Sequence, residues 1–198
     1  MKKVGSIMEF LLATTNKAKI RYYGSRLNEN GKDPIENAII KARAYYERTG
    51  LPSIAIDEGL FLDNVPDEIQ PGTHVRRVNG HRLNDEEMIE YYTSLVNKFG
   101  KDGRLHGYYL KAVAIVNGSD VRTYEYKDIC IFSNKQSQII DEGYPLASIR
   151  IIPQFNKFKS ELTKAEEEQT IDVAQKPILE FMVNSVKELE QHSTNLTR

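Results

Sequence analysis

The fold is decided by two stretches, Phe10-Leu11-Leu12-Ala13-Thr14-Thr15-Asn16-Lys17-Ala18-Lys19 and Ser53-Ile54-Ala55-Ile56-Asp57-Glu58-Gly59-Leu60. Each begins with an apolar run that is typical of a buried strand and then changes abruptly to polar residues. The first ends in hydroxyls, an amide and lysines, which suit a phosphate. The second ends in two carboxylates, which suit a hard divalent cation. A phosphate site and a metal site side by side indicate nucleotide chemistry.

Length and composition set the limits for this interpretation. The chain has 198 residues, enough for one well-buried domain or for two lobes that share a core. The 27 basic and 28 acidic residues balance, so we expect no nucleic acid and no anionic membrane as a partner. No apolar run follows Lys2 and Lys3 as in a signal peptide, which favours a cytoplasmic location. The single cysteine, Cys130, is expected in the core.

The region around the two stretches predicts alternating strands and helices. We expect a strand over residues 9–13, a helix over 17–28 and a second strand over 53–56. Between them, Asp33-Pro34-Ile35-Glu36 has an N-cap, a proline in the first turn and an acid placed for a capping box, so a second helix begins there. Gly50 is a suitable end for this helix.

The second half predicts a mixed sheet. Asn117-Gly118-Ser119-Asp120 joins two β-rich segments and is the strongest hairpin signal in the chain. An antiparallel hairpin within an α/β order argues against a simple doubly wound fold. The other expectations are an irregular segment over 64–83, a helix over 84–99, hairpin strands over 108–116 and 121–132, short strands over 138–140 and 148–152, and helices over 160–169 and 172–190.

The turn from Thr14 to Lys19 has two interpretations. A strand-to-helix turn directs backbone N–H groups and the positive end of the helix dipole at a bound anion. Thr14, Thr15 and Asn16 add donors, and Lys19 adds a charge. The alternative is an ordinary N-cap with solvated lysines.

The two carboxylates after the second strand also have two interpretations. Asp57 and Glu58 can hold Mg²⁺ or orient a water molecule if they face a cleft, or they form an ordinary surface turn with Gly59. Two other groups of charged residues are interpreted by default as solvated, namely Lys41 with Arg43, and Glu166-Glu167-Glu168. His74, Arg76 and Arg77 in the irregular segment could contact an anion, although a lone histidine in a loop is usually just exposed.

In chain order, these segments resemble the inosine triphosphate pyrophosphatases, the non-canonical purine nucleoside triphosphate pyrophosphatase family. Leu12 to Lys19 is similar to the family's phosphate motif, and Glu36 to Arg43 is similar to its second-helix signature. Thr49 to Leu60 is similar to the strand that bears the catalytic acid. Pro71-Gly72 with Arg76 and Arg77, and then Asn84 to Glu87, fit the segments that follow.

The resemblance implies an α/β fold with two lobes around an elongated mixed β-sheet and a central cleft for the nucleotide. It also implies a homodimer and a Mg²⁺-dependent hydrolase, with Mn²⁺ as an alternative metal, that converts a nucleoside triphosphate to the monophosphate and pyrophosphate. Asp57 would bind the metal and orient or deprotonate water, and Glu29 or Glu36 would be the second metal ligand. The residues implied for substrate binding are Thr14, Thr15, Asn16, Lys19, Lys41, Glu58, Arg76, Arg77 and Tyr144.

The sequence departs from the family pattern at several positions. Ile56 and Glu58 flank Asp57 where an acid and a small residue are usual. A strand between the first two helices is missing, and Glu29 is the nearest replacement for the metal-binding acid that this strand carries. Asp172-Val173-Ala174 stands at the Ser-His-Arg motif, and Glu168 falls near a substrate lysine. Tyr144 keeps the aromatic ring of the base-recognition motif, but the acid is absent.

Three hypotheses follow for the function. The first is a nucleoside triphosphate pyrophosphatase with an altered or unknown base preference, which would remove non-canonical nucleotides from the nucleotide pool. The second is a catalytically weak relative that binds a nucleotide or a partner protein. A structural protein that uses the same scaffold is a third.

Overall fold

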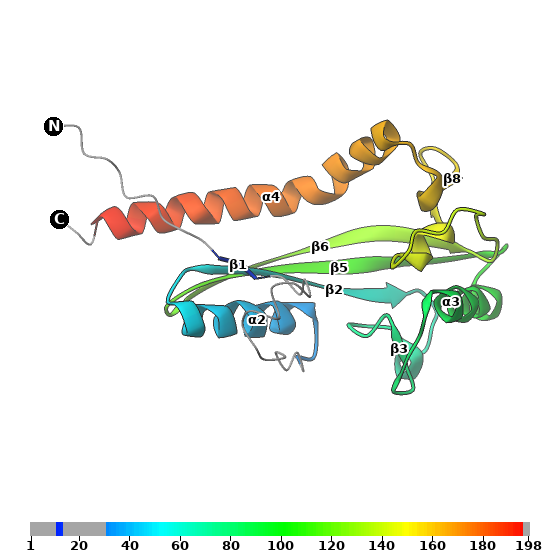
Figure 1. The fold of residues 1–198 in the computed structure, drawn as a ribbon, viewed down its shortest axis with the longest axis horizontal. Coiled ribbons are helices and arrows are strands. Elements are labelled where there is room, and N and C mark those ends of the chain that lie inside the picture. The colour runs from blue at the N-terminus through cyan, green and yellow to red at the C-terminus, as the bar shows by residue number, and fades with distance from the viewer. Residues whose placement is uncertain (1–10, 14–30, 196–198) are drawn as a thin grey trace. The chain divides into compact units, whose positions relative to one another are not determined.

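The computed structural model describes residues 11–13 and 31–195. Six strands form one mixed sheet in the order β1-β2-β5-β6-β7-β8 (Figure 1), and β3 and β4 form a separate two-stranded sheet. β1 (Leu11–Ala13) pairs with β2 (Ser53–Leu62) in parallel, whereas β7 (Arg150–Ile152) pairs antiparallel with β6 (Asp120–Ser133) and with β8 (Lys157–Phe158). The expected mixed α/β architecture is therefore confirmed. The helix expected over 17–28 lies outside the described residues.

The helix α2 (Pro34–Thr49) has the boundaries that its sequence predicts. The Asp33 side chain accepts a hydrogen bond from the backbone N–H of Glu36, and Pro34 occupies the first turn. Gly50 ends the helix in the left-handed conformation with φ 69°, which glycine adopts without a steric cost.

The strand β2 is longer than predicted, because it continues from Ser53 through Asp57 and Glu58 to Leu62. The expectation that the two carboxylates follow the end of a strand is therefore wrong. Their polarity resembles a strand end, but the centre of β2 is only partly buried, with Ile56 and Glu58 exposed. The strand tolerates charged residues at that point.

The chain divides into two compact units. The first contains the residues up to Asp57, Lys111–Tyr126 and the residues from Pro177 onward. In this unit, side chains on the sheet alternate between two clusters, as the period of a strand requires. One cluster packs against α2 and the other against α4 (Lys164–Asn195). The first consists of Ala38, Ala42, Tyr45, Ala55, Ala112, Ala114 and Val116, and the second of Ile54, Val113, Ile115, Ile178 and Leu189.

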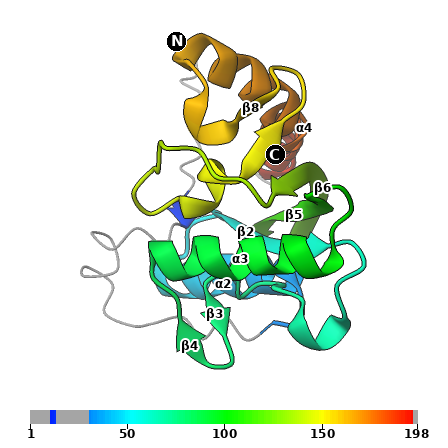
Figure 2. The same cartoon turned by 90° about the vertical axis from the view of Figure 1, so that its right-hand side faces the viewer.

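The second unit contains Glu58–Leu110 and Lys127–Lys176. Its core lies between the sheet and α3 (Asp85–Phe99), which Figure 2 shows across the front of the sheet. The predicted capping box of α3 is present, since Asn84 and Glu87 exchange side chain-to-backbone hydrogen bonds. Tyr92, Phe132, Leu60 and Ile149 are among its fully buried residues.

The hairpin of β5 (Arg104–Asn117) and β6 is confirmed, and its strands are longer than predicted. The segment expected to be irregular contains a short 3-10 helix, η1 (Asp67–Ile69), and the strands β3 (Arg77–Val78) and β4 (His81–Arg82).

The strand expected over 138–140 is absent, because this segment is an exposed loop. The backbone N–H of Ile139 bonds to the Ser137 hydroxyl, a local contact that competes with strand pairing. Instead of a strand from residue 148, the 3-10 helix η2 (Pro145–Ser148) precedes β7.

The two helices expected after residue 160 are also wrong. A 3-10 helix, η3 (Lys159–Glu161), precedes one continuous helix, α4, which contains Pro177.

Among the described helices, none has the length and apolar character that a bilayer span requires.

Candidate functional site

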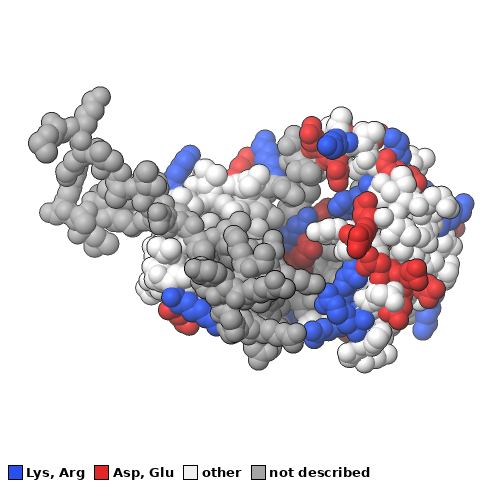
Figure 3. All heavy atoms as spheres, in the orientation of Figure 1, with Lys and Arg blue, Asp and Glu red and all other residues white. Residues whose placement is uncertain are grey.

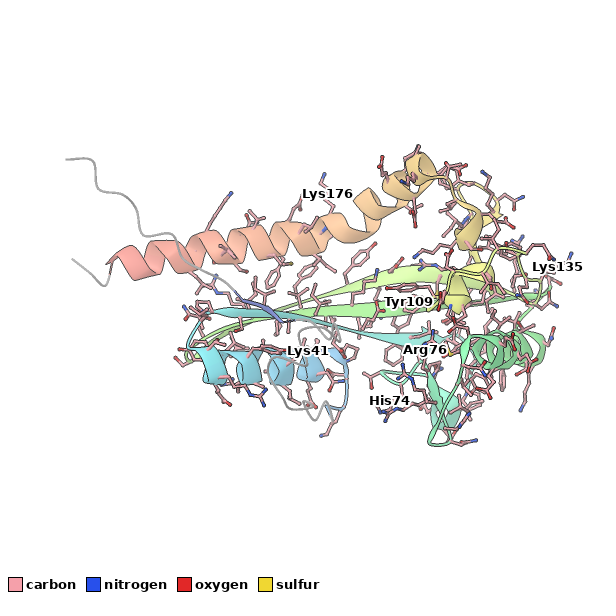
Figure 4. The ribbon with its side chains drawn as sticks, viewed as in Figure 1. Lys41, His74, Arg76, Tyr109, Lys135 and Lys176 are labelled. Carbon is pink, nitrogen blue, oxygen red and sulfur yellow. The ribbon has the colours of Figure 1, made fainter. Side chains whose placement is uncertain are left out.

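Lys41 lies on the buried face of α2 and faces the sheet (Figure 4). Its neighbours on this face are Ala38, Ala42 and Tyr45, and the lysine itself is only 3% exposed. The default interpretation of Lys41 as a solvated residue is therefore wrong, whereas Arg43 is exposed as expected. A buried ammonium needs charged or polar partners, because desolvation without them is costly.

Two acceptors from β2 surround the ammonium of Lys41. Its Nζ lies 3.1 Å from Oδ1 of Asp57 and 3.3 Å from the carbonyl oxygen of Ile56. The side chain of Asp57 is 14% exposed. The site therefore holds a carboxylate and an ammonium in a fixed, largely desolvated arrangement at the centre of β2.

The neighbouring carboxylate of Glu58 belongs to the opposite face of the strand, because side chains alternate along β2. Glu58 is exposed and belongs to the second compact unit. The geometry of β2 alone therefore does not place the carboxylates of Asp57 and Glu58 on one side of the strand, where they could bind the same ion.

Asp57 nevertheless fits a divalent cation. One of its oxygens accepts from Lys41, and within the described part of the chain the other oxygen, Oδ2, has no hydrogen-bond partner. Mg²⁺ is commonly held by one or two carboxylates together with the phosphates of its substrate. No cluster of three or more His, Cys, Asp or Glu side chains suited to a metal occurs among residues 31–195 with described side chains.

The predicted phosphate motif lies outside the described residues, and so does Glu29. This applies to Thr14, Thr15, Asn16 and Lys19. Glu36, the alternative second metal ligand, is exposed at the start of α2 and accepts a hydrogen bond from the backbone N–H of Lys32 at 2.8 Å. Its carboxylate therefore contributes to the helix start.

In the second unit, Arg76 does not project freely into solvent. Its Nη1 donates to Oδ1 of Asp85 at 2.7 Å, and its Nη2 donates to the carbonyl oxygen of Gly143 at 2.8 Å. The other oxygen of Asp85 accepts from the backbone N–H of Gly143 at 2.7 Å. This N–H and the Arg76 guanidinium hold the pKa of Asp85 below its usual value.

The other predicted binding residues of this unit are more exposed. Arg77 and His74 line a hollow of about 290 Å³ together with Tyr91 and Phe99. Tyr144 is 77% exposed and precedes η2. Figure 3 shows both basic and acidic side chains on the face in view.

A further ionic group in this unit was missed by the sequence interpretation. Nη2 of Arg150 donates to Asp128 at 2.9 Å and to the carbonyl oxygen of Ile129 at 3.2 Å, and the guanidinium lies 5.4 Å from the ring centroid of Tyr109. Burial raises the pKa of the Tyr109 hydroxyl. These residues come from three strands, so no local signal predicts the group.

Asp172, Val173 and Ala174, which stand at the family's Ser-His-Arg motif, lie within α4, and Glu168 is exposed on the same helix.

The family model "Ham1 family" matches residues 2–131. A dITP/XTP pyrophosphatase from Leptospira interrogans is 30% identical over 160 residues, which cover 79% of this chain and 77% of that protein. One from Vibrio parahaemolyticus is 27% identical over 192 residues, covering 85% of this chain and 90% of that protein.

Solved structures show the same fold. The Ham1 protein of Staphylococcus aureus has a TM-score of 0.67 at 21% identity, over 89% of this chain and 98% of that one. A nucleoside-triphosphatase / dITP/XTP pyrophosphatase from Mycobacterium abscessus also has a TM-score of 0.67, at 19% identity, over 87% and 98% of the two chains. The family resemblance inferred from the motifs is confirmed, and the chain belongs to the Ham1 family.

Proposed function

We propose that this protein is a Mg²⁺-dependent nucleoside triphosphate pyrophosphatase that hydrolyses its substrate to the monophosphate and pyrophosphate. Membership of the Ham1 family and similarity to proteins named dITP/XTP pyrophosphatases support this reaction class. The observation that carries the proposal is the pairing of Lys41 and Asp57 at 3.1 Å, because this contact holds the family-like acid in a fixed and largely buried position. A homodimer, which the family resemblance implies, and a cytoplasmic location, which the sequence favours, are part of the same proposal.

In this mechanism, Asp57 orients a water molecule by accepting a hydrogen bond from it through the oxygen that Lys41 does not occupy. The water oxygen forms a bond to the α-phosphorus, and the bond from that phosphorus to the bridging oxygen breaks. Pyrophosphate leaves with the electrons of that bond, and the proton passes to solvent. Phosphoryl transfer requires positioning and charge neutralisation more than covalent chemistry, and the contact with Lys41 supplies the positioning of Asp57.

Mg²⁺, with Mn²⁺ as an alternative, would neutralise charge on the phosphates when bound. Asp57 is the ligand that its free oxygen and partial exposure favour, and Glu29 is the proposed second ligand. Thr14, Thr15, Asn16 and Lys19 are proposed to hold the triphosphate, with Arg77 and Glu58 as further contacts.

The base preference is proposed to differ from that of the family. A six-keto purine is recognised by donors to its oxygen, and such polar recognition discriminates by orders of magnitude. Asp172, Val173 and Ala174 offer no such donor, since an ionised aspartate only accepts. Tyr144 retains an aromatic ring, and stacking tolerates different bases. We expect kcat/KM for ITP to exceed that for ATP by less than about tenfold, against the orders of magnitude that donor-based recognition gives.

Pyrophosphate release from ITP, XTP, dITP and ATP with Mg²⁺ or Mn²⁺ tests this proposal. Turnover with at least one substrate supports it, and a hundredfold preference for ITP would contradict the proposed base recognition. No release with any nucleotide would contradict the enzymatic proposal. In that case the departures at Ile56 and Asp172-Val173-Ala174 favour a relative that binds nucleotides without turnover.

A further inference from the structure

A cavity of about 400 Å³ lies within the second compact unit, and four strands of the sheet contribute to its lining. β5 contributes Arg104, β6 Ser133, β7 Ile151 and β8 Phe158. Its described lining includes none of the residues proposed above to bind substrate or metal. A cavity of this size is large enough for a small organic molecule.

One side of this cavity is apolar. Ile151 pairs directly with Ile131 of β6 and with Phe158 of β8, so these three side chains lie on the same face of the sheet. Ile151 and Phe158 line the cavity and are half-buried. Ser133 is two residues beyond Ile131 on β6 and therefore lies on the same face. The aromatic ring and the aliphatic side chain form a surface on which a flat apolar group can pack.

Three lining residues offer donors that the rest of the described chain does not use. The guanidinium of Arg104 and the ammonium of Lys135, which follows the end of β6 (Figure 4), have no hydrogen-bond or ion-pair partner among the described residues. The Ser133 hydroxyl accepts from the Lys135 N–H at 2.9 Å, but its proton has no acceptor in the described part of the chain. Ser133 is only 6% exposed, and buried polar groups normally have partners. These donors suit the oxygens of an anion.

The acidic residues of the lining compensate these two cations only in part. Glu161 accepts two hydrogen bonds, of 2.7 and 3.2 Å, from neighbouring protein groups. Lys157, the third basic residue of the lining, is paired with Glu166 at 2.6 Å. Asp102 is exposed and is the remaining acid. The groups without a protein partner therefore carry a net positive charge.

Backbone hydrogen bonds fix the donors in place. Lys101 and Arg104 exchange backbone bonds of 2.8 and 3.0 Å across Asp102 and Gly103, whose φ values of 52° and 72° are those of a tight hairpin turn. The Asn134 N–H donates to the Gly103 carbonyl at 3.0 Å, which joins this turn to the end of β6. Because the backbone is already ordered, a ligand pays less conformational entropy on binding.

We propose that this cavity binds a phosphate monoester with a flat apolar body. The phosphate contacts Arg104, Ser133 and Lys135, and the body packs on Ile151 and Phe158. A phosphate monoester has three terminal oxygens and a charge near −2, which match one hydroxyl and two cations better than a carboxylate does. The inference goes beyond the proposed function and does not depend on it, because these residues take no part in the proposed hydrolysis.

A ¹⁵N NMR titration of the full chain in metal-free buffer tests the proposal, with phenyl phosphate as the probe. The amides of Gly103 and Asn134 report on the cavity, because both residues line it. We expect saturable shifts of both amides with phenyl phosphate. Inorganic phosphate should bind at least about fivefold more weakly, because it has no ring to bury on Ile151 and Phe158. Phenol, which lacks the phosphate, should not saturate these shifts.

Two substitutions in the cavity should change Kd for phenyl phosphate in opposite directions. Arg104→Gln should raise Kd about tenfold or more, because a charge-assisted contact is lost. Asp102→Asn should lower Kd about twofold or more, because it removes a negative charge and asparagine also adopts the left-handed conformation. Lys127→Gln is the matched control, since Lys127 lies over the Tyr108 ring at 4.3 Å and does not line the cavity. Its Kd should be that of the wild-type protein.

The proposal is overturned if phenyl phosphate produces no saturable shift at Gly103 and Asn134, or if inorganic phosphate binds as tightly as phenyl phosphate. It is also overturned if Arg104→Gln and Lys127→Gln change Kd equally, or if Asp102→Asn weakens binding. The tighter binding expected for Asp102→Asn cannot arise from a misfolded variant. Since turnover is not measured, a protein that releases no pyrophosphate refutes the proposed enzyme and leaves this test unaffected.

Discussion

Replacing Lys41 with methionine tests whether the buried ion pair organises the first compact unit. Methionine keeps most of the aliphatic length of the lysine but removes the ammonium. The carboxylate of Asp57 would then lose a partner at 3.1 Å, and the carbonyl of Ile56 would lose a donor at 3.3 Å. Lys41 is only 3% exposed, so water cannot take its place without local opening.

The expected cost follows from the burial of the two partners. Removing one member of a buried pair costs about 3–5 kcal/mol, because the other charge is left without compensation. Asp57 is 14% exposed and keeps some hydration, which places the expected loss near the lower end, at about 3 kcal/mol. For a chain of this length, that corresponds to a fall in Tm of about 6–12 °C.

Differential scanning calorimetry of the wild-type protein and Lys41→Met measures this shift. Lys157→Met is the control, because Lys157 pairs with Glu166 at a more exposed position, and a surface pair contributes about 0–1 kcal/mol. Adding Asp57→Asn to Lys41→Met should recover most of the lost Tm, since the unpaired charge is removed. A fall below about 2 °C, or no recovery in the double variant, would refute the reasoning.

Three further predictions concern the second unit. Gly107→Ala should lower Tm by several degrees, because a Cβ at this position would clash with the carbonyl oxygen of Phe61. Overpacking of this kind costs about 1–3 kcal/mol. A Tm equal to that of the wild-type protein would contradict this prediction. Cys130 is 2% exposed, and burial raises the pKa of its thiol to about 12. Iodoacetamide at pH 8 should therefore label Cys130 only after unfolding. Rapid labelling of the native protein would contradict this prediction. The hydrogen bonds from Lys157 and the Thr163 N–H lower the pKa of Glu166 to about 2. The stabilisation from this contact is therefore present above about pH 4.5 and is lost as the pH falls toward 2. A carboxyl NMR titration should find the midpoint of Glu166 at this pKa, and Lys157→Ala should raise the midpoint.

The sequence predicted those parts of the fold that have local causes. The start of α2 at Asp33 and the capping box of α3 at Asn84 are encoded within four residues, and the turn at Gly118 lies within the hairpin it closes. The boundaries of β2 and α4 were wrong, because pairing and packing with distant segments extend an element through polar residues or a proline.

The site was predictable to the same extent. The role of Asp57, which was inferred from its motif, stays a prediction. The burial of Lys41 was missed, although the spacing of Ala38, Lys41, Ala42 and Tyr45 places the lysine on an apolar helix face. That pattern was a usable signal. The hydrogen-bonded group of Arg76, Asp85 and Gly143 had no such signal, since Arg76 and Gly143 are 67 residues apart in the sequence and meet only in the folded chain.

The central claim is that Asp57 carries the hydrolysis of a nucleoside triphosphate to pyrophosphate. The most direct test is ³¹P NMR of the products that the wild-type protein and Asp57→Asn form from ITP with Mg²⁺, with circular dichroism to establish that the variant is folded. We predict inosine monophosphate and pyrophosphate in equal amounts from the wild-type protein, and a kcat for Asp57→Asn below about a tenth of the wild-type value, a barrier increase above about 1.4 kcal/mol. Release of orthophosphate, or a folded Asp57→Asn variant that keeps more than this tenth, would contradict the account.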